Sequence, residues 1–423
     1  MKILIVSSYD IGGAAKSCLR LYEGLLAKDV NCSLLLKRQT IHHRNVSLLK
    51  PISKKHPFLQ SIKQKLHKVL FKFKLVNKID SSNVVFLKNR PKGLELFSFP
   101  KSNYDITKSP LYEEADIINL HWVAGFLDYE TFFKYNKKPV VWTLHDMHPF
   151  TGGEHYEEQL LGIDTDGNPI KRNKTDIEKR TTAVNKNYIF QALKNVENLT
   201  IVAPSKWLAN EAKNSDAFSN RPIHWIPYGI NPEIFKPRDR DYSRELFGIA
   251  KDKKVVLFVA DSINNQRKGY GYIKMALEKI ESKTVVLCAI GQKSEELTAI
   301  KNVIELGPIH DERLMSMVYS LADVFVIPSL MDNLPNTVLE SLMCGTPVIG
   351  FPTGGIPDMV QHGKNGLLTE NISVQSLSNT LNDFLNEKYS FSRNQIRTSA
   401  MNAYDQKIQA EAYRVLFEEV LKK

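Results

Sequence analysis

Short apolar runs, each followed by a turn and a helical pattern, recur along most of the chain and constrain its fold more than any other feature. In the first half they lie at Ile3–Ser8, Cys32–Leu36, Asp116–Leu120, Pro139–Leu144 and Thr200–Ala203. In the second half they lie at Val255–Val259, Val285–Ala289, Val324–Ile327 and Pro347–Gly350. Such runs are typical of buried strands in a parallel sheet that helices cover on both faces. The pattern therefore predicts an α/β fold.

A break in this alternation divides the chain of 423 residues, which is long for one hydrophobic core. The segment Trp225–Pro232 contains two prolines and a glycine and is typical of a linker. We therefore predict two Rossmann-like domains, residues 1–224 and 225–403, that face each other across a cleft, and a helix at 404–423 that packs back on the first domain. The polar region Gly152–Thr182 is predicted to be a long surface loop. Helices are expected at Lys16–Ala27, Asp311–Leu321, Pro335–Cys344 and Val374–Asn386.

Composition narrows the class of protein. Apolar residues make up 43% of the chain and charged residues 24%, which is ordinary for soluble globular proteins. The four cysteines (Cys18, Cys32, Cys288 and Cys344) show neither a CxxC pair nor metal-ligand spacing, so we expect buried reduced thiols. The first apolar run is too short for a signal peptide, and no run is long enough to span a bilayer. These features predict a cytoplasmic protein.

The net charge of +11 is concentrated in one segment. Residues 50–92 contain twelve Lys or Arg against one acid, Asp80, and apolar side chains such as Phe73 recur there every three or four residues. The lysines that lie away from this apolar stripe include Lys63, Lys65, Lys68 and Lys72. The pattern predicts a helix on the anionic inner face of a membrane, and the alternative is a helix that packs its stripe on the first domain. The chain offers no readout element or stacking platform for nucleic acid.

A glycine pair follows the first predicted strand. Gly12 and Gly13 allow the backbone to come close to a ligand, and the helix that follows presents free N–H groups to an anion. The turn is therefore a candidate phosphate contact, and the alternative is a tight turn without a ligand.

Two acids follow a strand of the second predicted domain. Within Phe325–Gly350 a loop carries Asp332 and Asn333, Pro335 opens a helix, and Glu340 lies on the second turn of that helix. Eight helical residues span roughly 12 Å, about the reach from a donor hexose to its nucleotide ribose. Glu340 can then accept hydrogen bonds from ribose hydroxyls and Asp332 from sugar hydroxyls. The alternative is two solvated carboxylates near a helix start.

The stretch around Asp332 resembles the signature of the retaining glycosyltransferases of family 4, which have the two-domain GT-B fold. Their pattern is Glu, seven residues and Glu, followed by a small-residue turn and a Gly-Thr-Pro-Val strand. The chain departs from this pattern at Asp332, where the family has Glu, and the shorter side chain withdraws the carboxylate from the usual sugar contact. The turn Gly354-Gly355-Ile-Pro-Asp358 and the segment His362–Leu368 match further blocks of the family.

Basic residues in the second domain fit the same family. Gln266-Arg-Lys-Gly resembles the segment that grips the donor pyrophosphate, which implies that Arg267 and Lys268 neutralise the leaving group. A further Arg that the family often has just after the preceding strand is absent from Ala260-Asp261-Ser262. The other residues implied to contact the donor are Ile309, beside the nucleotide base, and Asn333 and Asn336, at the helix start.

The first domain carries a related similarity. Val140-Val-Trp-Thr-Leu-His-Asp resembles a subgroup of the family, in which the histidine that corresponds to His145 contacts the donor sugar. A neutral imidazole can bind a sugar hydroxyl there, and the alternative is a histidine bonded to the backbone. His121 and Trp122 resemble a strand-end position that borders the acceptor. The subgroup's loop cysteines are absent, since Glu154 follows Thr-Gly-Gly.

The resemblance implies a glycosyltransferase that moves a sugar from a nucleotide-diphosphate donor to a glycan or lipid-linked acceptor with retention of configuration, in surface polysaccharide biosynthesis. His145 and Asp332 are the catalytic residues that it implies. No cofactor or metal is expected, because no cluster of oxygen ligands is apparent in the sequence. Two alternatives stay open: a GT-B nucleotide-sugar epimerase, and a non-catalytic protein that binds sugar nucleotides or glycans. The motifs leave the sugar, the nucleotide, the acceptor and the oligomeric state undetermined.

Overall fold

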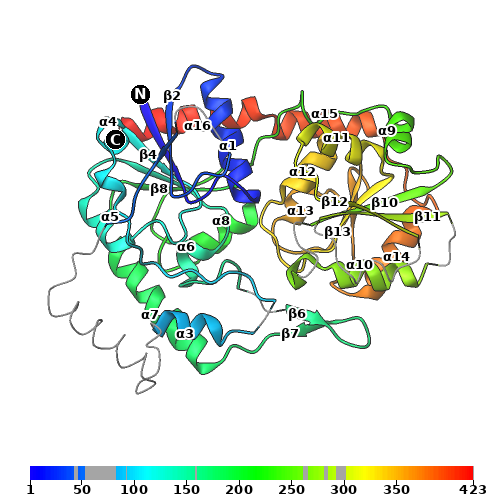
Figure 1. The fold of residues 1–423 in the computed structure, drawn as a ribbon, viewed down its shortest axis with the longest axis horizontal. Helices are drawn as coiled ribbons and strands as arrows, with labels where there is room; N and C mark the ends of the chain where they lie inside the picture. The colour runs from blue at the N-terminus through cyan, green and yellow to red at the C-terminus, as the bar shows by residue number, and fades with distance from the viewer. Residues whose placement is uncertain are drawn as a thin grey trace, which may run out of the picture.

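The computed structural model describes residues 1–41, 46–52, 82–91, 93–157, 160–260, 265–280, 284–291 and 302–422. It contains two parallel sheets, each flanked by helices, in two lobes that lie side by side (Figure 1). A short antiparallel hairpin extends from the first lobe beneath the second. The predicted α/β architecture with two Rossmann-like domains is confirmed.

The first sheet has seven parallel strands in the order β3-β2-β1-β4-β5-β8-β9. Their bounds are β1 Lys2–Ser7, β2 Asn31–Leu36, β3 Val46–Leu48, β4 Ile117–Leu120, β5 Val140–Thr143, β8 Leu199–Ala203 and β9 Ile223–Trp225. β4, β5 and β8 are buried along their whole length. Helices cover both faces of the sheet, and this is why the central strands are unbroken apolar runs in the sequence.

The second sheet has six parallel strands in the order β12-β11-β10-β13-β14-β15. Their bounds are β10 Lys254–Val259, β11 Val285–Ile290, β12 Val303–Gly307, β13 Val324–Ile327, β14 Val348–Gly350 and β15 Gly366–Leu368. The order reverses beside β1 in the first sheet and beside β10 in the second. Such reversals open a crevice at the carboxyl ends of the strands. The loops that follow these strand ends carry the candidate residues.

The helices described before the linker are α1 Gly13–Leu26, α3 Ser82–Lys88, α4 Pro110–Glu114, α5 Tyr129–Tyr135, α6 His148–Thr151, α7 Asp176–Leu193 and α8 Lys206–Lys213, with the 3₁₀ turn η1 Ile106–Lys108. Those that follow are α9 Arg240–Leu246, α10 Tyr270–Glu278, α11 Glu312–Leu321, α12 Asn336–Met343, α13 Ile356–Met359, α14 Val374–Leu385, α15 Arg393–Tyr404 and α16 Gln406–Leu421, with η2 Gln266–Lys268. The four predicted helices correspond to α1, α11, α12 and α14 within three residues at each end.

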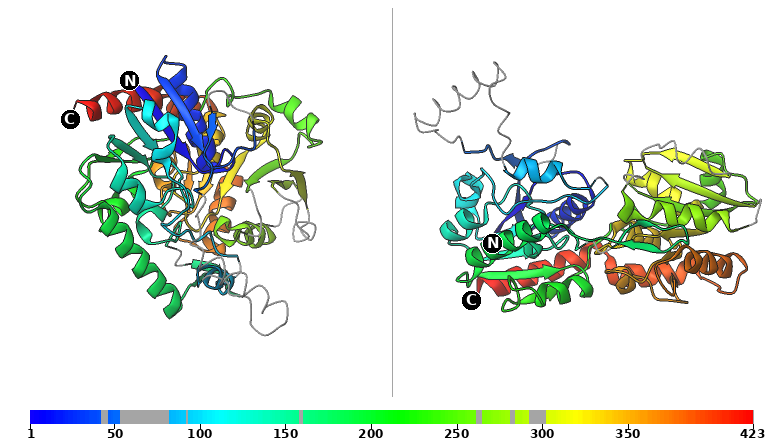
Figure 2. Two further views of the ribbon diagram at one scale, coloured as in Figure 1. Left: turned by 60° about the vertical axis from the view of Figure 1, so that its left-hand side comes forward. Right: turned by 90° about the horizontal axis from the view of Figure 1, so that it is seen from below.

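The final helix returns to the first lobe. α16 packs on α1, where a Cβ added at Gly24 would lie 3.1 Å from the Cβ of Ala410. Tyr413 and Phe417 are fully buried in the apolar cluster that α16 shares with β1 and α1. Both chain termini therefore lie on the first lobe, as Figure 2 shows.

The prediction of a long surface loop at Gly152–Thr182 is wrong. The region contains a hairpin of β6 (Leu160–Ile163) and β7 (Pro169–Lys171), and α7 begins within it. The start of α7 carries a capping box between Thr175 and Glu178, a signal that was present in the sequence.

Contacts with the second lobe explain why the hairpin forms without a long apolar run. Ile163 packs against the apolar core of that lobe. The hydroxyl of Tyr272 donates to the carbonyl oxygen of Gly162 at 3.2 Å, and the N–H of Val374 donates to that of Gly167 at 2.9 Å. The short strands β3, β9 and β12 are likewise missing from the sequence-based prediction, whereas β15 lies in the segment His362–Leu368 that matched the family.

Most of the basic segment lies outside the described residues. Lys63, Lys65, Lys68, Lys72 and Phe73 all fall within residues 53–81, so the predicted membrane contact there stays a prediction. Over the ranges that the structure describes, no helix combines the length and the apolar character that a membrane span requires. All four cysteines are buried and unbridged, as expected.

The packing of α16 gives a test of stability. Phe417→Ala removes a fully buried ring, so we expect the free energy of unfolding to fall by about 3–5 kcal/mol in urea titrations. Val415→Ala on the same helix is the matched control, because Val415 is 40% exposed and its truncation should cost well under half as much. Equal losses in the two variants would contradict the placement of α16.

Candidate functional site

Two hydrogen bonds from Asn336 join the start of α12, in the second lobe, to the start of α1, in the first. Gly12 has φ 96° and precedes α1, a backbone conformation that favours glycine. The side-chain amide of Asn336 donates to the carbonyl oxygen of Gly13 at 3.0 Å and to the hydroxyl of Ser17 at 2.9 Å. Two helix N-termini thus converge here, and such ends attract anions.

Glu340 lies on the second turn of α12 and is 5% exposed. Its carboxylate accepts a hydrogen bond from Arg20 of α1 at 2.7 Å and one from the hydroxyl of Tyr319 at 3.0 Å. Arg20 also pairs with Glu312 at 2.6 Å. A cation from the first lobe therefore compensates this buried acid in the second, which the sequence did not indicate. The ribose contact of Glu340 stays a prediction.

Asp332 follows β13 and is 6% exposed. Its Oδ2 lies 2.7 Å from Lys268 Nζ and 3.3 Å from Arg267 Nη1. Burial alone would raise the pKa of the Asp332 carboxyl, but the charges of Lys268 and Arg267 outweigh it and lower the pKa to about 2. Asp332 is therefore ionised at neutral pH.

The loop that carries Asp332 is braced by the glycine turn that the sequence singled out. The N–H of Gly355 donates to the carbonyl oxygen of Asp332 at 2.9 Å. A Cβ added at Gly354 would lie 1.9 Å from that same oxygen, so a side chain cannot fit there. This close approach explains the glycine pair in physical terms.

Arg267 is held by groups of both lobes. Its Nε lies 2.6 Å from Glu95 and its Nη1 donates to the carbonyl oxygen of Met331 at 2.7 Å. The guanidinium lies 4.6 Å from the ring centroid of Tyr156. Glu95 and Tyr156 belong to the first lobe, and no motif in the sequence pointed to them. The contacts of Arg267 and Lys268 with a pyrophosphate stay predictions.

His145 is the centre of a buried hydrogen-bond relay. His121 Nε2 lies 2.9 Å from Asn119 Oδ1, His121 Nδ1 lies 2.9 Å from His145 Nε2, and His145 Nδ1 lies 2.7 Å from the Tyr228 hydroxyl. Asn119 Oδ1 can only accept, so His121 carries its proton on Nε2 and accepts at Nδ1. His145 then donates from Nε2 and accepts from Tyr228 at Nδ1. This set of donors and acceptors satisfies both rings in their neutral forms.

The pKa values agree with this assignment. Burial, chiefly, lowers the pKa of His145 to about 4. Burial and the neighbouring His145 lower the pKa of His121 well below its ordinary value. The neutral imidazole expected at position 145 is therefore present, but both of its nitrogens are bonded to protein groups.

His145 also marks the junction of the lobes. The side-chain amide of Asn333 donates to the carbonyl oxygen of His145 at 3.0 Å, and Asn333 Oδ1 accepts from the Ser205 hydroxyl at 2.5 Å. Trp122 is directed to the first lobe, where its Nε1 donates to Asp146 Oδ2 at 2.8 Å. Contact of His121 and Trp122 with an acceptor stays a prediction.

The remaining donor residue of the sequence analysis, Ile309, lies just after β12. It is partly buried and packs against the apolar core of the second lobe. Within the ranges covered by the structure, no group of three or more His, Cys, Asp or Glu side chains is arranged to hold a metal ion.

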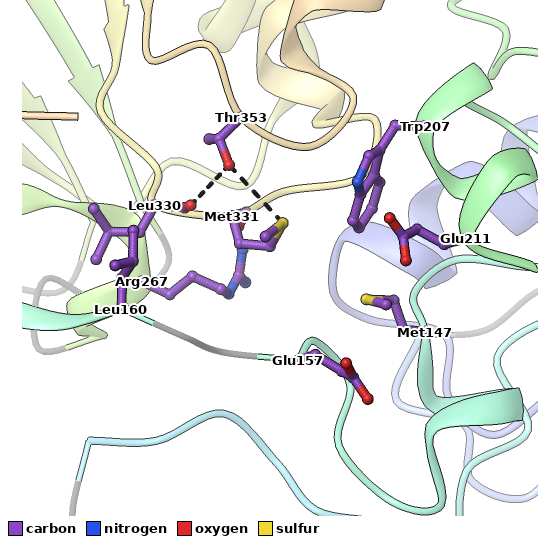
Figure 3. A pocket seen from close by; sticks show the side chains of 9 residues that line it. All are labelled: Met147, Glu157, Leu160, Trp207, Glu211, Arg267, Leu330, Met331 and Thr353. Atoms are coloured by element: carbon purple, nitrogen blue, oxygen red, sulfur yellow. Dashed lines mark hydrogen bonds between the residues drawn. The ribbon is translucent and has the colours of Figure 1, made fainter. Parts of the chain in front are cut away.

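A cavity of about 260 Å³ opens beside Asp332. Side chains of both lobes line it, as Figure 3 shows. They are Met147, Glu157, Leu160, Trp207 and Glu211 from the first lobe, and Arg267, Leu330, Met331 and Thr353 from the second.

The relay predicts a loss of stability in acid. Because folding lowers the pKa of His145 from 6.5 to about 4, its contribution is complete above pH 6.5 and is lost as the pH falls toward 4. The difference is on the order of 3 kcal/mol. Tm should therefore be flat above about pH 6.5 and should fall below it.

The matched variants are His145→Gln and His310→Gln. The first should reduce the slope of Tm against pH, whereas the second, at an exposed position, should keep the profile of the unchanged protein. An equally steep slope in His145→Gln would contradict the neutral relay.

Comparisons with known proteins give similarities for part of the sequence and for the whole fold. Residues 253–387 match the family model described as glycosyl transferases group 1. The D-inositol 3-phosphate glycosyltransferase of Mycolicibacterium smegmatis is 26% identical over 172 residues, which cover 38% of this chain and 39% of that protein. The sulfoquinovosyl transferase SQD2 of Arabidopsis thaliana is 26% identical over 208 residues, which cover 47% of this chain and 40% of that protein. The chain spans about two fifths of the length of these curated relatives.

Similarity to solved structures extends over the whole chain. The sucrose-phosphate synthase of Thermosynechococcus elongatus has a TM-score of 0.70 at 16% identity and covers 100% of this chain and 99% of its own. Anabaena HepE, solved in complex with UDP and glucose, has a TM-score of 0.65 at 17% identity and covers 99% of each chain. The chain therefore has the GT-B fold, and its residues 253–387 carry a glycosyl transferases group 1 domain.

Proposed function

We propose that the protein is a retaining glycosyltransferase that moves a hexosyl group from a nucleotide-diphosphate sugar to a glycan or lipid-linked acceptor. The observation that carries this proposal is the pair of buried carboxylates, Asp332 and Glu340, at either side of the α12 N-terminus. The glycine turn at Gly12 and Gly13 faces the same helix end through Asn336. The relatives that transfer sugars and the structure of HepE with UDP and glucose support this reading.

In this proposal the donor diphosphate lies between the N-termini of α1 and α12. The helix dipoles and the cations Arg267 and Lys268 stabilise the charge that develops as the anomeric carbon–oxygen bond breaks. The ribose hydroxyls donate to Glu340. The sugar lies toward Asp332, whose carboxylate accepts from its hydroxyls.

The acceptor hydroxyl attacks the anomeric carbon on the face that the diphosphate leaves. The new glycosidic bond forms as the bond to the phosphate oxygen breaks, and that oxygen takes the proton of the acceptor hydroxyl. The configuration at the anomeric carbon is therefore retained, and no cofactor or metal takes part. His145 can receive a sugar hydroxyl at Nδ1 only by giving up the hydrogen bond from Tyr228.

Transfer can be tested with the intact chain, a panel of UDP- and GDP-sugars and methyl glycosides as acceptors. We expect one donor to be consumed only when an acceptor is present, with the anomeric configuration of the product, read by NMR, equal to that of the donor. Release of a free epimerised sugar without an acceptor, or inversion, would contradict the proposal.

Glu340→Gln tests the donor site separately. The variant keeps the shape of the side chain and removes the charge that the ribose hydroxyls contact, so we expect the affinity for UDP or GDP in calorimetry to fall about tenfold. Glu312→Gln is the matched control, because it removes the other carboxylate on Arg20 and leaves Glu340 in place. Unchanged affinity in Glu340→Gln would exclude the ribose contact.

We further propose that the protein works at the inner face of a membrane, in surface polysaccharide synthesis. The support is the excess of eleven positive charges in residues 50–92. Val84, Val85 and Leu87 of α3, at the end of that segment, are 40–44% exposed. Lysines near an anionic surface contribute about 1 kcal/mol each.

Vesicle binding tests this second proposal. Replacing Lys63, Lys65, Lys68 and Lys72 by Glu should abolish cosedimentation with anionic phospholipid vesicles, because four attractive charges become repulsive. The control replaces four exposed lysines elsewhere by Glu: Lys137, Lys171, Lys194 and Lys364. Binding that survives the first set, or is lost equally with the second, would contradict this membrane contact.

A further inference from the structure

The cavity between the lobes shares Arg267 with the donor contacts described above, and its other lining residues have no role in them. Leu330 and Met331, which line it, directly precede Asp332 in the loop after β13. Thr353 donates its hydroxyl to the carbonyl oxygen of Leu330 at 2.9 Å and precedes the glycine turn that braces Asp332. The cavity is therefore continuous with the surroundings of Asp332.

The cavity is separate from the surroundings of Glu340. Arg20 and Tyr319, which hold Glu340, are not among the residues that line it. The cavity therefore does not reach the contacts that hold Glu340. On the proposed function, a group that occupies the cavity lies beside Arg267 and the loop of Asp332, where the transferred sugar joins the diphosphate.

One wall of the cavity is aromatic. Trp207, on α8, is partly exposed and lies nearly parallel to the ring of Tyr156, with centroids 6.4 Å apart and 21° between the planes. Arg267 lies over the other aromatic ring, that of Tyr156. Figure 3 shows Trp207 on the side of the cavity opposite Leu330 and Arg267. A flat aromatic surface at a cavity wall offers a stacking face to the C–H side of a sugar ring.

Two carboxylates lie on the same side as Trp207. Glu211 follows it by one turn of α8, and Glu157 comes from the loop before β6. Within the described part of the chain, Glu211 makes no hydrogen bond or ion pair, while Glu157 lies 3.3 Å from Lys186 Nζ. Burial and the charge of Glu157 raise the pKa of Glu211 above its ordinary value. An unpartnered carboxylate beside an aromatic face is an acceptor for sugar hydroxyls.

We propose that this cavity is the acceptor subsite and that it takes one neutral saccharide ring, stacked on Trp207, with hydroxyls donated to Glu211 and Glu157. The volume of about 260 Å³ is just below the range typical of small-molecule pockets, roughly 300–1,000 Å³, and suits a single ring. A sugar that carries a carboxylate is excluded, because it would add a negative charge beside Glu211 and Glu157, whereas the charge of Arg267 is already compensated by Glu95 and Asp332. The inference rests on the proposed function.

Direct binding tests the subsite without relying on transfer. The probes are methyl β-D-glucopyranoside and its acidic counterpart, methyl β-D-glucuronide, added to the intact chain with UDP and followed by saturation-transfer NMR. We expect the ring protons of the glucoside to receive saturation and those of the glucuronide not to. Absence of glucoside binding, or equal binding of the two probes, would overturn the proposal.

Matched variants locate the binding. Trp207→Ala should abolish saturation transfer from the glucoside, and Glu211→Gln should raise its dissociation constant about tenfold. Trp225→Ala is the control for the first, since Trp225 is 47% exposed and does not line the cavity. Glu197→Gln, at another exposed acid of the first lobe, is the control for the second. Binding that is unchanged in Trp207→Ala would place the glucoside elsewhere and overturn the subsite.

A further measurement separates this proposal from the proposed function. UDP affinity should be the same in Trp207→Ala, in Glu211→Gln and in the unchanged protein, which also shows that the variants are folded. If no donor supports transfer but glucoside binding depends on Trp207, the subsite stands and the glycosyltransferase proposal fails. If transfer occurs and the KM for the acceptor is unchanged in Trp207→Ala, only the subsite is overturned.

Discussion

The site depends on compensating the charges of two buried carboxylates, Asp332 and Glu340. A single charge removed from water costs several kcal/mol unless a partner compensates it, or the group takes up a proton instead. Asp332 meets this requirement inside its own lobe, through Lys268 and Arg267. Glu340 meets it through Arg20, a residue of the opposite lobe. Arg20 reaches Glu340 only while the lobes are together, so the compensation of this carboxylate and the contact between the lobes are coupled.

The lobes are joined on two sides, and the two connections differ in kind. On one side α16 buries apolar side chains such as Phe417 on the first lobe, next to the bridge between Ile230 and Asp405. On the other side the β6–β7 hairpin and the Glu95–Arg267 ion pair cross to the second lobe through a few polar contacts and the packing of Leu160 and Ile163. Separating the apolar surfaces that α16 buries costs more free energy than breaking the contacts of the hairpin. Entry of a large ligand from the hairpin side is therefore less costly than from the side of α16.

The parts of this arrangement that could be predicted from the sequence are those formed by residues close together in the chain. Unbroken apolar runs located the central strands, and the eight-residue spacing placed Asp332 and Glu340 around the start of α12. It did not predict Arg20, which lies 320 positions from its partner Glu340, because only the tertiary fold brings such residues together. The hairpin was missed for a related reason: its strands are short, and the apolar surface that stabilises them belongs to the other lobe.

The two lobes also bring opposite electrostatic properties to the proposed reaction. The second lobe supplies an ionised Asp332, whose pKa is about 2, whereas the first supplies a neutral His145, whose pKa is about 4. As the bond to the diphosphate breaks, positive charge develops on the sugar. An imidazolium at His145 would oppose that charge, and a carboxylate at Asp332 favours it. Burial keeps His145 of the Asn119–His121–His145–Tyr228 relay neutral, and in the proposed reaction this keeps a repulsive charge away from the reacting carbon.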